Sequence, residues 1–357
     1  MIVKKGEVKT FSLLIACNGS IVPAIFRKVI LSVVLAVLAT ALRLGLFGDG
    51  ASNATEMSFA PFTALGVAIS LFLGFHNNAS YSRWWEARTY WGTLIIYMRN
   101  LSRFLMCYCE GPDIEDLDEY LCAAYTEEGE ASNMTDNSVS PDKLKNFQQE
   151  TQDWRVHLIL LSVAHTHALR AQLRPYSKSD GENQAIQDRD RFLSPSEVET
   201  ISHSKNPANA ILIIMGKILG EAYKISENNL DSYTRVEISR HIDNLCEIQT
   251  ACERIKNTSL PIAYSLLVAR TSFLYVFFVP FAMASTMRWW TPIFTGIVAY
   301  TFFGLDKLSR QIKEPFNDKP MCLALSAMSR VNEIDALEII KCKHIPPYLL
   351  PHKDILM

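Results

Sequence analysis

The sequence predicts an all-helical membrane protein with four transmembrane helices and a helical region in the cytosol. Long charge-poor runs lie near both ends of the chain, and most charged residues lie between them. The middle of the chain has apolar residues at helical spacing, and no useful length of it alternates between apolar and polar residues as a strand does. Of the 357 residues, 49% are hydrophobic, which excludes a disordered or fibrous protein.

Four apolar runs are candidates for crossing a bilayer, which requires about 20 mostly apolar residues per helix. They cover Val29–Leu42 (of spanning length if extended to Gly48), Phe59–Phe75, Thr271–Met287 and Trp290–Leu305. Each is shorter than an ideal span, so helices buried in a soluble core are the alternative. Short links join the first run to the second and the third to the fourth, which favours two transmembrane hairpins.

Basic residues lie outside the ends of these hairpins, and they predict the orientation of the chain. They are Lys4, Lys5, Lys9, Arg27, Lys28, Arg83, Arg88, Arg99, Arg103, Lys307, Arg310 and Lys313. By the positive-inside rule, both termini and the middle segment are cytoplasmic in a multi-pass protein of the cell membrane. The predicted parts are a cytosolic segment 1–28, hairpins 29–75 and 259–305, a cytosolic helical region 76–258 and a cytosolic segment 306–357. The first apolar run begins too late for a signal peptide.

Other classes of function lack their usual signals. The net charge of −2 argues against wholesale binding of nucleic acid. The eight cysteines contain no CxxC pair or zinc-ligand spacing, and none of the common catalytic or phosphate-binding motifs occurs. We therefore expect no enzyme, cofactor or metal site. The segment 110–142 has eleven acidic residues without Lys or Arg, and a surface loop is favoured there over a calcium site because EF-hand spacing is absent.

The second apolar run carries the candidate functional residues. Gly66, Ser70 and Gly74 are spaced four apart, so on a helix they form a ridge of small residues that allows close helix packing. Beside that ridge lies a stripe of larger apolar residues with the same spacing, formed by Val67, Leu71 and Phe75. An apolar stripe on a spanning helix either faces lipid or faces other protein.

The same helix then becomes polar at His76, Asn78 and Ser82. If copies of this helix surround an axis, the apolar stripe forms narrow rings and these three residues form a wider inner mouth of the pore. A narrow apolar ring excludes water and so acts as a gate. One chain supplies one such helix, so this arrangement requires a symmetric oligomer. Arg83, Glu86 and their aromatic neighbours are interpreted as structural, with an Arg–Glu pair beside aromatic anchors.

The segment LGFHNNASYSRWWEARTYWG at 73–92 resembles the signature of the bestrophin family, particularly its prokaryotic-type branch. Further matching pieces are Ala-Pro-Phe at 60–62, Cys-Glu-Arg at 252–254, Pro-Ile-Ala-Tyr at 261–264 and Glu-Pro-Phe at 314–316. Their order and spacing cover nearly the whole chain except the acidic segment and the C-terminal tail.

This resemblance implies a homopentameric ion channel with an axial pore, whose neck falls on Val67, Leu71 and Phe75. It also implies a second constriction near Tyr233, where an aliphatic residue is usual in the family. The conducted ion is expected to be chloride or another anion, with a sodium channel of the same architecture as the alternative. Animal members bind calcium through an acidic run that is reduced here to one carboxylate beside a lysine at 317–320. A membrane-anchored scaffold that binds a cytosolic partner also explains the spans and the acidic segment.

Overall fold

A computed structural model of the chain describes residues 21–44, 58–111, 153–174, 180–225, 230–342 and 345–351. All regular secondary structure in these ranges is helical, which confirms the predicted all-helical class for the part of the chain described. The acidic segment predicted at 110–142 lies outside these ranges apart from its first two residues. The basic residues before Ile21 and the extension of the first run to Gly48 lie outside them as well.

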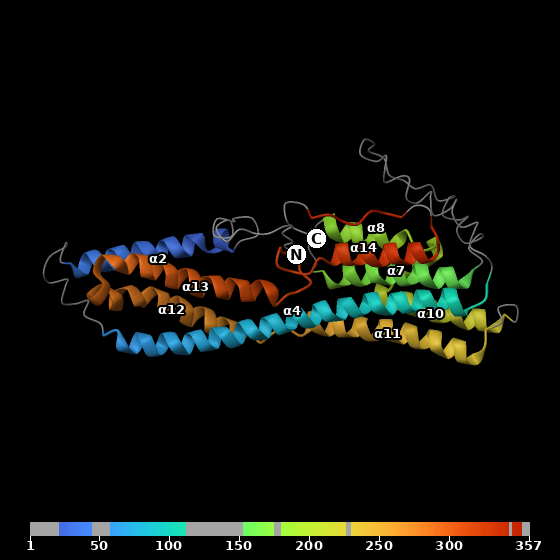
Figure 1. Cartoon of the computed structure of the whole chain (residues 1–357), viewed down its shortest axis with the longest axis horizontal. Helices are drawn as coiled ribbons and strands as arrows, with labels where there is room; N and C mark the ends of the chain where they lie inside the picture. The colour runs from blue at the N-terminus through green and yellow to red at the C-terminus, as the bar shows by residue number, and fades with distance from the viewer. Residues whose placement is uncertain are drawn as a thin grey trace, which may run out of the picture.

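The described helices form two bundles that lie end to end in an elongated molecule (Figure 1). The apolar bundle contains α2 (Val22–Arg43), the first half of α4 (Ala60–Tyr108), α12 (Ile262–Met287) and α13 (Thr291–Ile312). The polar bundle contains the second half of α4 with α7 (Trp154–Leu173), α8 (Asp180–Asp190), α9 (Pro195–Ser202), α10 (Pro207–Lys224), α11 (Ser232–Asn257) and α14 (Leu325–Ile339). The 49-residue helix α4 runs through both bundles, a length of about 70 Å.

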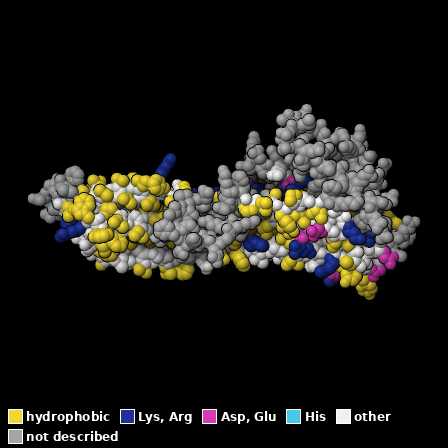
Figure 2. Space-filling view, turned by 45° about the horizontal axis from the view of Figure 1, so that its top comes forward, with side chains coloured by type: hydrophobic (Ala, Val, Ile, Leu, Met, Phe, Trp, Pro, Cys, Tyr) yellow, Lys and Arg dark blue, Asp and Glu magenta, His cyan; other side chains and the backbone are white. Residues whose placement is uncertain are grey.

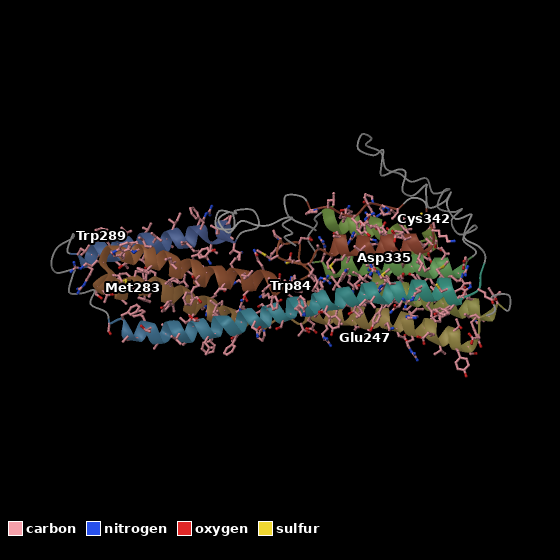
Figure 3. All side chains as sticks on the ribbon, in the orientation of Figure 1. Trp84, Glu247, Met283, Trp289, Asp335 and Cys342 are labelled. Atoms are coloured by element: carbon pink, nitrogen blue, oxygen red, sulfur yellow. The ribbon has the colours of Figure 1, made fainter. Side chains whose placement is uncertain are left out.

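Among the described residues, three segments are long and apolar enough to cross a membrane: Val22–Arg43, Ala60–Tyr108 and Ile262–Ile312. The third folds back on itself at the 3₁₀ turn η3 (Arg288–Trp290), where Arg288 has a φ of 46°, so that α12 and α13 pack together. The turn at Trp289 lies at the end of the molecule remote from the polar bundle (Figure 3). The first helix begins at Val22 rather than at the predicted Val29, because a proline in its first turn suits a helix start.

The surface of the apolar bundle is unlike that of a water-soluble protein. Hydrophobic side chains cover it, whereas most of the charged side chains in the same view lie over the polar bundle (Figure 2). On α2 alone, large apolar side chains such as Phe26, Leu31 and Val34 are exposed. An apolar surface of this extent is stable when lipid covers it and costly in water. Together with the lengths of the helices, it indicates a membrane protein.

The polar bundle has its own core around α7. Leu158, Ile159, Leu160 and Leu161 are consecutive in the sequence and all are buried, as expected of a helix that is surrounded by others. Helices α4, α8, α10 and α14 pack around it. Its first turn is capped by Asp153, whose side chain accepts a hydrogen bond from the backbone N–H of Arg155.

A carboxylate is buried in this core. Glu333 on α14 lies 3.3 Å from Arg330 and 3.5 Å from His167 on α7. Burial by itself raises the pKa of Glu333, but the nearby imidazole of His167 and the charges of Arg330 and Arg191 outweigh burial and lower this pKa to about 2. The polar bundle therefore holds an ionised carboxylate in its interior.

The packing of α4 against the polar bundle predicts a strong effect of its buried aromatic side chain. Trp91 is completely buried in the core, so Trp91→Ala should lower the free energy of unfolding by about 3–5 kcal/mol. Tyr108→Ala, on the same helix but 71% exposed, should lower it by less than about 1 kcal/mol. Thermal and denaturant unfolding of the detergent-solubilised protein measures both variants, and equal losses would contradict the assigned core.

Candidate functional site

Val67, Leu71 and Phe75 lie on one outward face of α4. Their side chains are 66%, 58% and 58% exposed. Residues between them, such as Ile69 and Leu73, are buried against α12 and α13 in the core of the apolar bundle. The helix therefore packs with one side inside its own chain and leaves the apolar stripe of residues 67, 71 and 75 uncovered.

Two of the three residues predicted for the inner mouth continue this face. Asn78 and Ser82 are exposed, and their positions follow Phe75 at steps of three and four residues along the helix. We call the face formed by Val67, Leu71, Phe75, Asn78 and Ser82 the outer face of α4. It changes from apolar to polar in the direction of the polar bundle.

His76 does not belong to this face, and its predicted place at the inner mouth is wrong. The side chain is only 1% exposed, with its Nε2 3.0 Å from the Ser265 hydroxyl on α12 and its Nδ1 2.7 Å from the Ser309 hydroxyl on α13. The hydroxyl of Ser80 completes the cluster, 2.8 Å from that of Ser309. The reason is helical geometry, since residue 76 follows the buried Leu73 by three positions and precedes the buried Ser80 by four. His76 thus joins α4 to two neighbouring helices.

The ridge of small residues is divided between two environments. A Cβ added at Gly66 would lie 2.5 Å from the Tyr275 hydroxyl, so this glycine permits the close approach of α4 and α12. Ser70 is exposed and donates a hydrogen bond to the Gly66 carbonyl at 2.7 Å. A Cβ added at Gly74 would meet nothing within 4 Å. Only Gly66 therefore packs within the chain in the way that the spacing predicts for all three residues.

Tyr233 lies far from the outer face of α4. It is in the first turn of α11, at the end of the molecule opposite the apolar bundle, and it is 87% exposed (Figure 1). The helix starts here because the Asp231 side chain accepts a hydrogen bond from the backbone N–H of Thr234 at 2.9 Å. Tyr233 has the exposure that a constriction residue needs, and its role stays a prediction.

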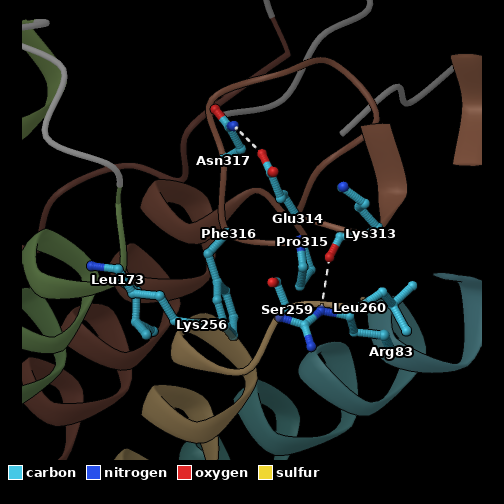
Figure 4. Close-up of a pocket in the computed structure, with 10 residues that line it drawn as sticks. All are labelled: Arg83, Leu173, Lys256, Ser259, Leu260, Lys313, Glu314, Pro315, Phe316 and Asn317. Atoms are coloured by element: carbon cyan, nitrogen blue, oxygen red, sulfur yellow. Dashed lines mark hydrogen bonds between the residues drawn. The ribbon is translucent and has the colours of Figure 1, made fainter. Parts of the chain in front are cut away.

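Arg83 fixes the joint between the two bundles (Figure 4). Its guanidinium donates to the Lys313 carbonyl at 2.8 Å and to the carbonyls of Ile255 and Thr258. These carbonyls lie at the C-terminal ends of α13 and α11, where backbone acceptors lack partners within the helix. The Arg–Glu pair predicted for this segment therefore does not involve Arg83, and Glu86 lies instead 3.3 Å from Arg254.

A cavity of about 190 Å³ adjoins this joint, between the stem of Lys256 and the ring of Phe316 (Figure 4). Residues 314–317, which directly precede the single carboxylate of the segment 317–320, form part of its lining. The amide of Asn317 donates to the Glu314 carboxylate at 3.0 Å. Within the described residues, no group of three His, Cys, Asp or Glu side chains is placed to hold a metal ion.

Known proteins resemble this chain over almost its full length. The family described as "Bacterial/Fungal Bestrophin protein" matches residues 1–128 and 129–338. A voltage-dependent anion channel-forming protein of Mesorhizobium japonicum is 33% identical over 338 residues, which are 94% of this chain and 90% of that protein. The voltage-dependent anion channel-forming protein YneE of Escherichia coli K12 is 29% identical over 298 residues, which are 84% and 82% of the two chains.

The fold agrees with these sequence matches. A crystal structure of a bacterial bestrophin homologue from Klebsiella pneumoniae superposes with a TM-score of 0.68 at 27% identity, over 90% of this chain and 100% of that one. The names of the Mesorhizobium and Escherichia relatives describe channel-forming proteins and no enzyme, in agreement with the prediction that the chain is not an enzyme. The predicted family is confirmed: the chain belongs to the bacterial and fungal bestrophins.

Proposed function

We propose that the protein is an anion channel in which copies of α4 surround a central pore, with Val67, Leu71 and Phe75 forming its neck. The observation that carries the proposal is the outer face of α4, which is apolar at Val67, Leu71 and Phe75 and then polar at Asn78 and Ser82. The relatives named as anion channel-forming proteins support the choice of ion. No observation on the described residues favours the sodium alternative.

The small residues beside the stripe favour a pore over a lipid-facing surface. Ser70 and Gly74 are exposed next to Leu71 and Phe75, and a Cβ added at Gly74 would meet no atom of the described residues within 4 Å. Lipid tails fit around side chains of any size, whereas helices approach one another closely only where small residues meet. A neighbouring α4 fits this place, and the apolar stripe then points toward the axis.

The assembly is a closed ring of five copies, the number that the family resemblance implies, with cyclic symmetry. Three rings of apolar side chains exclude water from a narrow neck and so close the pore without a blocking charge. The apolar bundle crosses the membrane, and the polar bundle and both termini are cytoplasmic. Tyr233 is the residue that we assign to a second, cytosolic constriction.

The first prediction concerns assembly. The protein in mild detergent should have the mass of five chains, measured by light scattering or native mass spectrometry. Gly74→Leu should reduce the pentameric fraction at least several-fold, because the longer side chain fills the space that a neighbouring α4 requires. Gly216→Leu is the matched control, since this glycine of α10 also has open space around it. A monomeric wild-type protein, or equal effects of both substitutions, would refute the proposed arrangement.

The second prediction concerns the gate. Combined replacement of Val67, Leu71 and Phe75 by alanine should raise the open probability in planar bilayers at least several-fold, because smaller apolar rings let water remain in the neck. Selectivity should stay the same, because no charge has changed. The control is the triple alanine variant of Leu31, Val34 and Val37, which are exposed on α2. Unchanged gating in the α4 variant, or the same gain in the α2 variant, counts against the assigned neck.

The third prediction concerns the ion. In liposomes or bilayers with unequal potassium chloride concentrations, the current should reverse near the equilibrium potential of chloride. Reversal near the potassium potential, or near that of sodium when sodium replaces potassium, would overturn the proposed selectivity. Absence of any conductance from correctly folded protein would favour a membrane-anchored scaffold instead.

A further inference from the structure

The polar bundle contains a second cavity, of about 210 Å³, between α4 and α14. Its lining includes Met98, Arg99 and Ser102 from α4 and Asn332, Asp335 and Ala336 from α14. In the sequence these two groups of residues are more than 200 positions apart. The volume far exceeds the ~15 Å³ that one water molecule requires, so the cavity has room for a small organic molecule.

Asn332 marks the cavity as a polar binding site. Its side chain is 1% exposed, yet neither the amide oxygen nor the amide nitrogen has a hydrogen-bond partner in the part of the chain that the structure describes. A buried amide without partners is destabilising, and native proteins usually satisfy such groups with protein or a bound molecule. A molecule that satisfies this amide therefore both donates and accepts a hydrogen bond. Ser102 is also buried at this cavity.

Arg99 and Asp335 give the cavity one charge of each sign. The Arg99 Nε lies 2.8 Å from the Asp335 Oδ2, and this hydrogen bond raises the pKa of Arg99. The terminal guanidinium nitrogens of Arg99 form no hydrogen bond to other described residues, and neither does the Asp335 Oδ1. Because the two charges offset each other, a ligand with a single charge gains little from them. A ligand with both charges complements both residues.

The walls limit the size and character of the ligand. Met98 and Ala336 are almost completely buried and supply apolar surface beside the polar groups. A molecule that fits has a short aliphatic part, one anionic group and one cationic group. The volume excludes larger molecules such as nucleotides.

We propose that this cavity binds a small zwitterion, an amino acid, with its carboxylate on Arg99 and its ammonium on Asp335 and the Asn332 amide oxygen. The Asn332 nitrogen and the Ser102 hydroxyl donate to the ligand carboxylate or to a polar side chain. The site lies on the same helix as Val67, Leu71 and Phe75, but binding there does not depend on their role in conduction.

Isothermal titration of the full-length protein in detergent tests the site with glycine, L-serine and L-glutamine. Acetate and methylammonium serve as probes that carry only one of the two charges. We expect at least one amino acid to bind, at one per chain and at least tenfold more tightly than either single-charge probe. Failure of all three amino acids to bind at millimolar concentration, as in a cavity that holds water alone, would overturn the proposal. Equal affinity for acetate or methylammonium would overturn it too.

Variants then locate the binding site. Asn332→Leu keeps the number and branching of the side-chain heavy atoms without either polar atom and should weaken binding at least tenfold. Arg99 lies at the more exposed side of the cavity, and Arg99→Gln should also weaken binding at least tenfold. This second variant provides the test if the Asn332 variant does not fold. Asn244→Leu, on the partly exposed side of α11, is the control and should bind as the wild type does. Wild-type affinity in a folded Asn332 or Arg99 variant would place the binding elsewhere and refute this site.

Discussion

The arrangement of the chain depends on the rotational orientation of α4 about its own axis, because this orientation decides which of its side chains are buried. This helix is continuous from Ala60 to Tyr108, so a rotation at any point turns every side chain along it. Two sets of polar contacts fix that rotation near the middle of the helix. His76 and Ser80 bind the hydroxyl of Ser309 on α13, and His76 also binds Ser265 on α12. Arg83 binds carbonyls at the ends of α11 and α13.

These contacts explain why the apolar stripe is left uncovered. A hydrogen-bonded histidine and serine inside an otherwise apolar bundle are costly to separate, because each group would lose its partner in surroundings that offer no other. The helix therefore cannot turn to bury Leu71 or Phe75 without exposing unpaired polar atoms. Polar groups on one side of α4 thus decide which apolar groups remain on the other side. A few hydrogen bonds therefore determine the orientation of α4 in the apolar bundle.

Much of this arrangement follows from the sequence, because it depends on local spacing. The positions of Val67, Leu71 and Phe75 on one face need only the period of a helix, and their exposure agrees with that period. The hairpin of α12 and α13 likewise follows from run lengths and a short link. The link predicted to join α2 to α4 lies outside the described residues, and α2 packs against α12 and α13. The buried state of His76 was harder to predict, because its partners Ser265 and Ser309 are 189 and 233 residues away. The polarity of His76 alone favours exposure, whereas its steps of three residues from Leu73 and four residues to Ser80 favour burial.

Partners that are distant in the sequence also account for the other differences between the sequence predictions and the structure. In the sequence, Glu333 resembles an ordinary surface residue of a helix. Its contacts with His167 and Arg191 become apparent only in the folded chain. Arg83 has Glu86 one helical turn away, and that nearby carboxylate suggests an ion pair. The fold instead offers Arg83 a set of helix-end carbonyls, for which it is better suited because a guanidinium has several donors in fixed directions. Sequence spacing identifies which residues share a face of a helix, but it does not identify the distant groups that contact that face.

The ridge of small residues on α4 connects the proposed assembly with the width of the proposed pore, because only one of its three residues packs within the chain. Gly66 packs inside the chain against Tyr275, while Ser70 and Gly74 are exposed where the proposed assembly places a neighbouring α4. In lipid, helices gain nothing by burying apolar surface against one another, so their separation is set by how closely the backbones approach. In the proposed ring, the ridge at Ser70 and Gly74 sets that separation, and the adjacent stripe at Leu71 and Phe75 sets how much of the enclosed space is filled. A neck narrow enough to exclude water therefore requires both stripes together, small residues to bring the helices close and large ones to fill the axis.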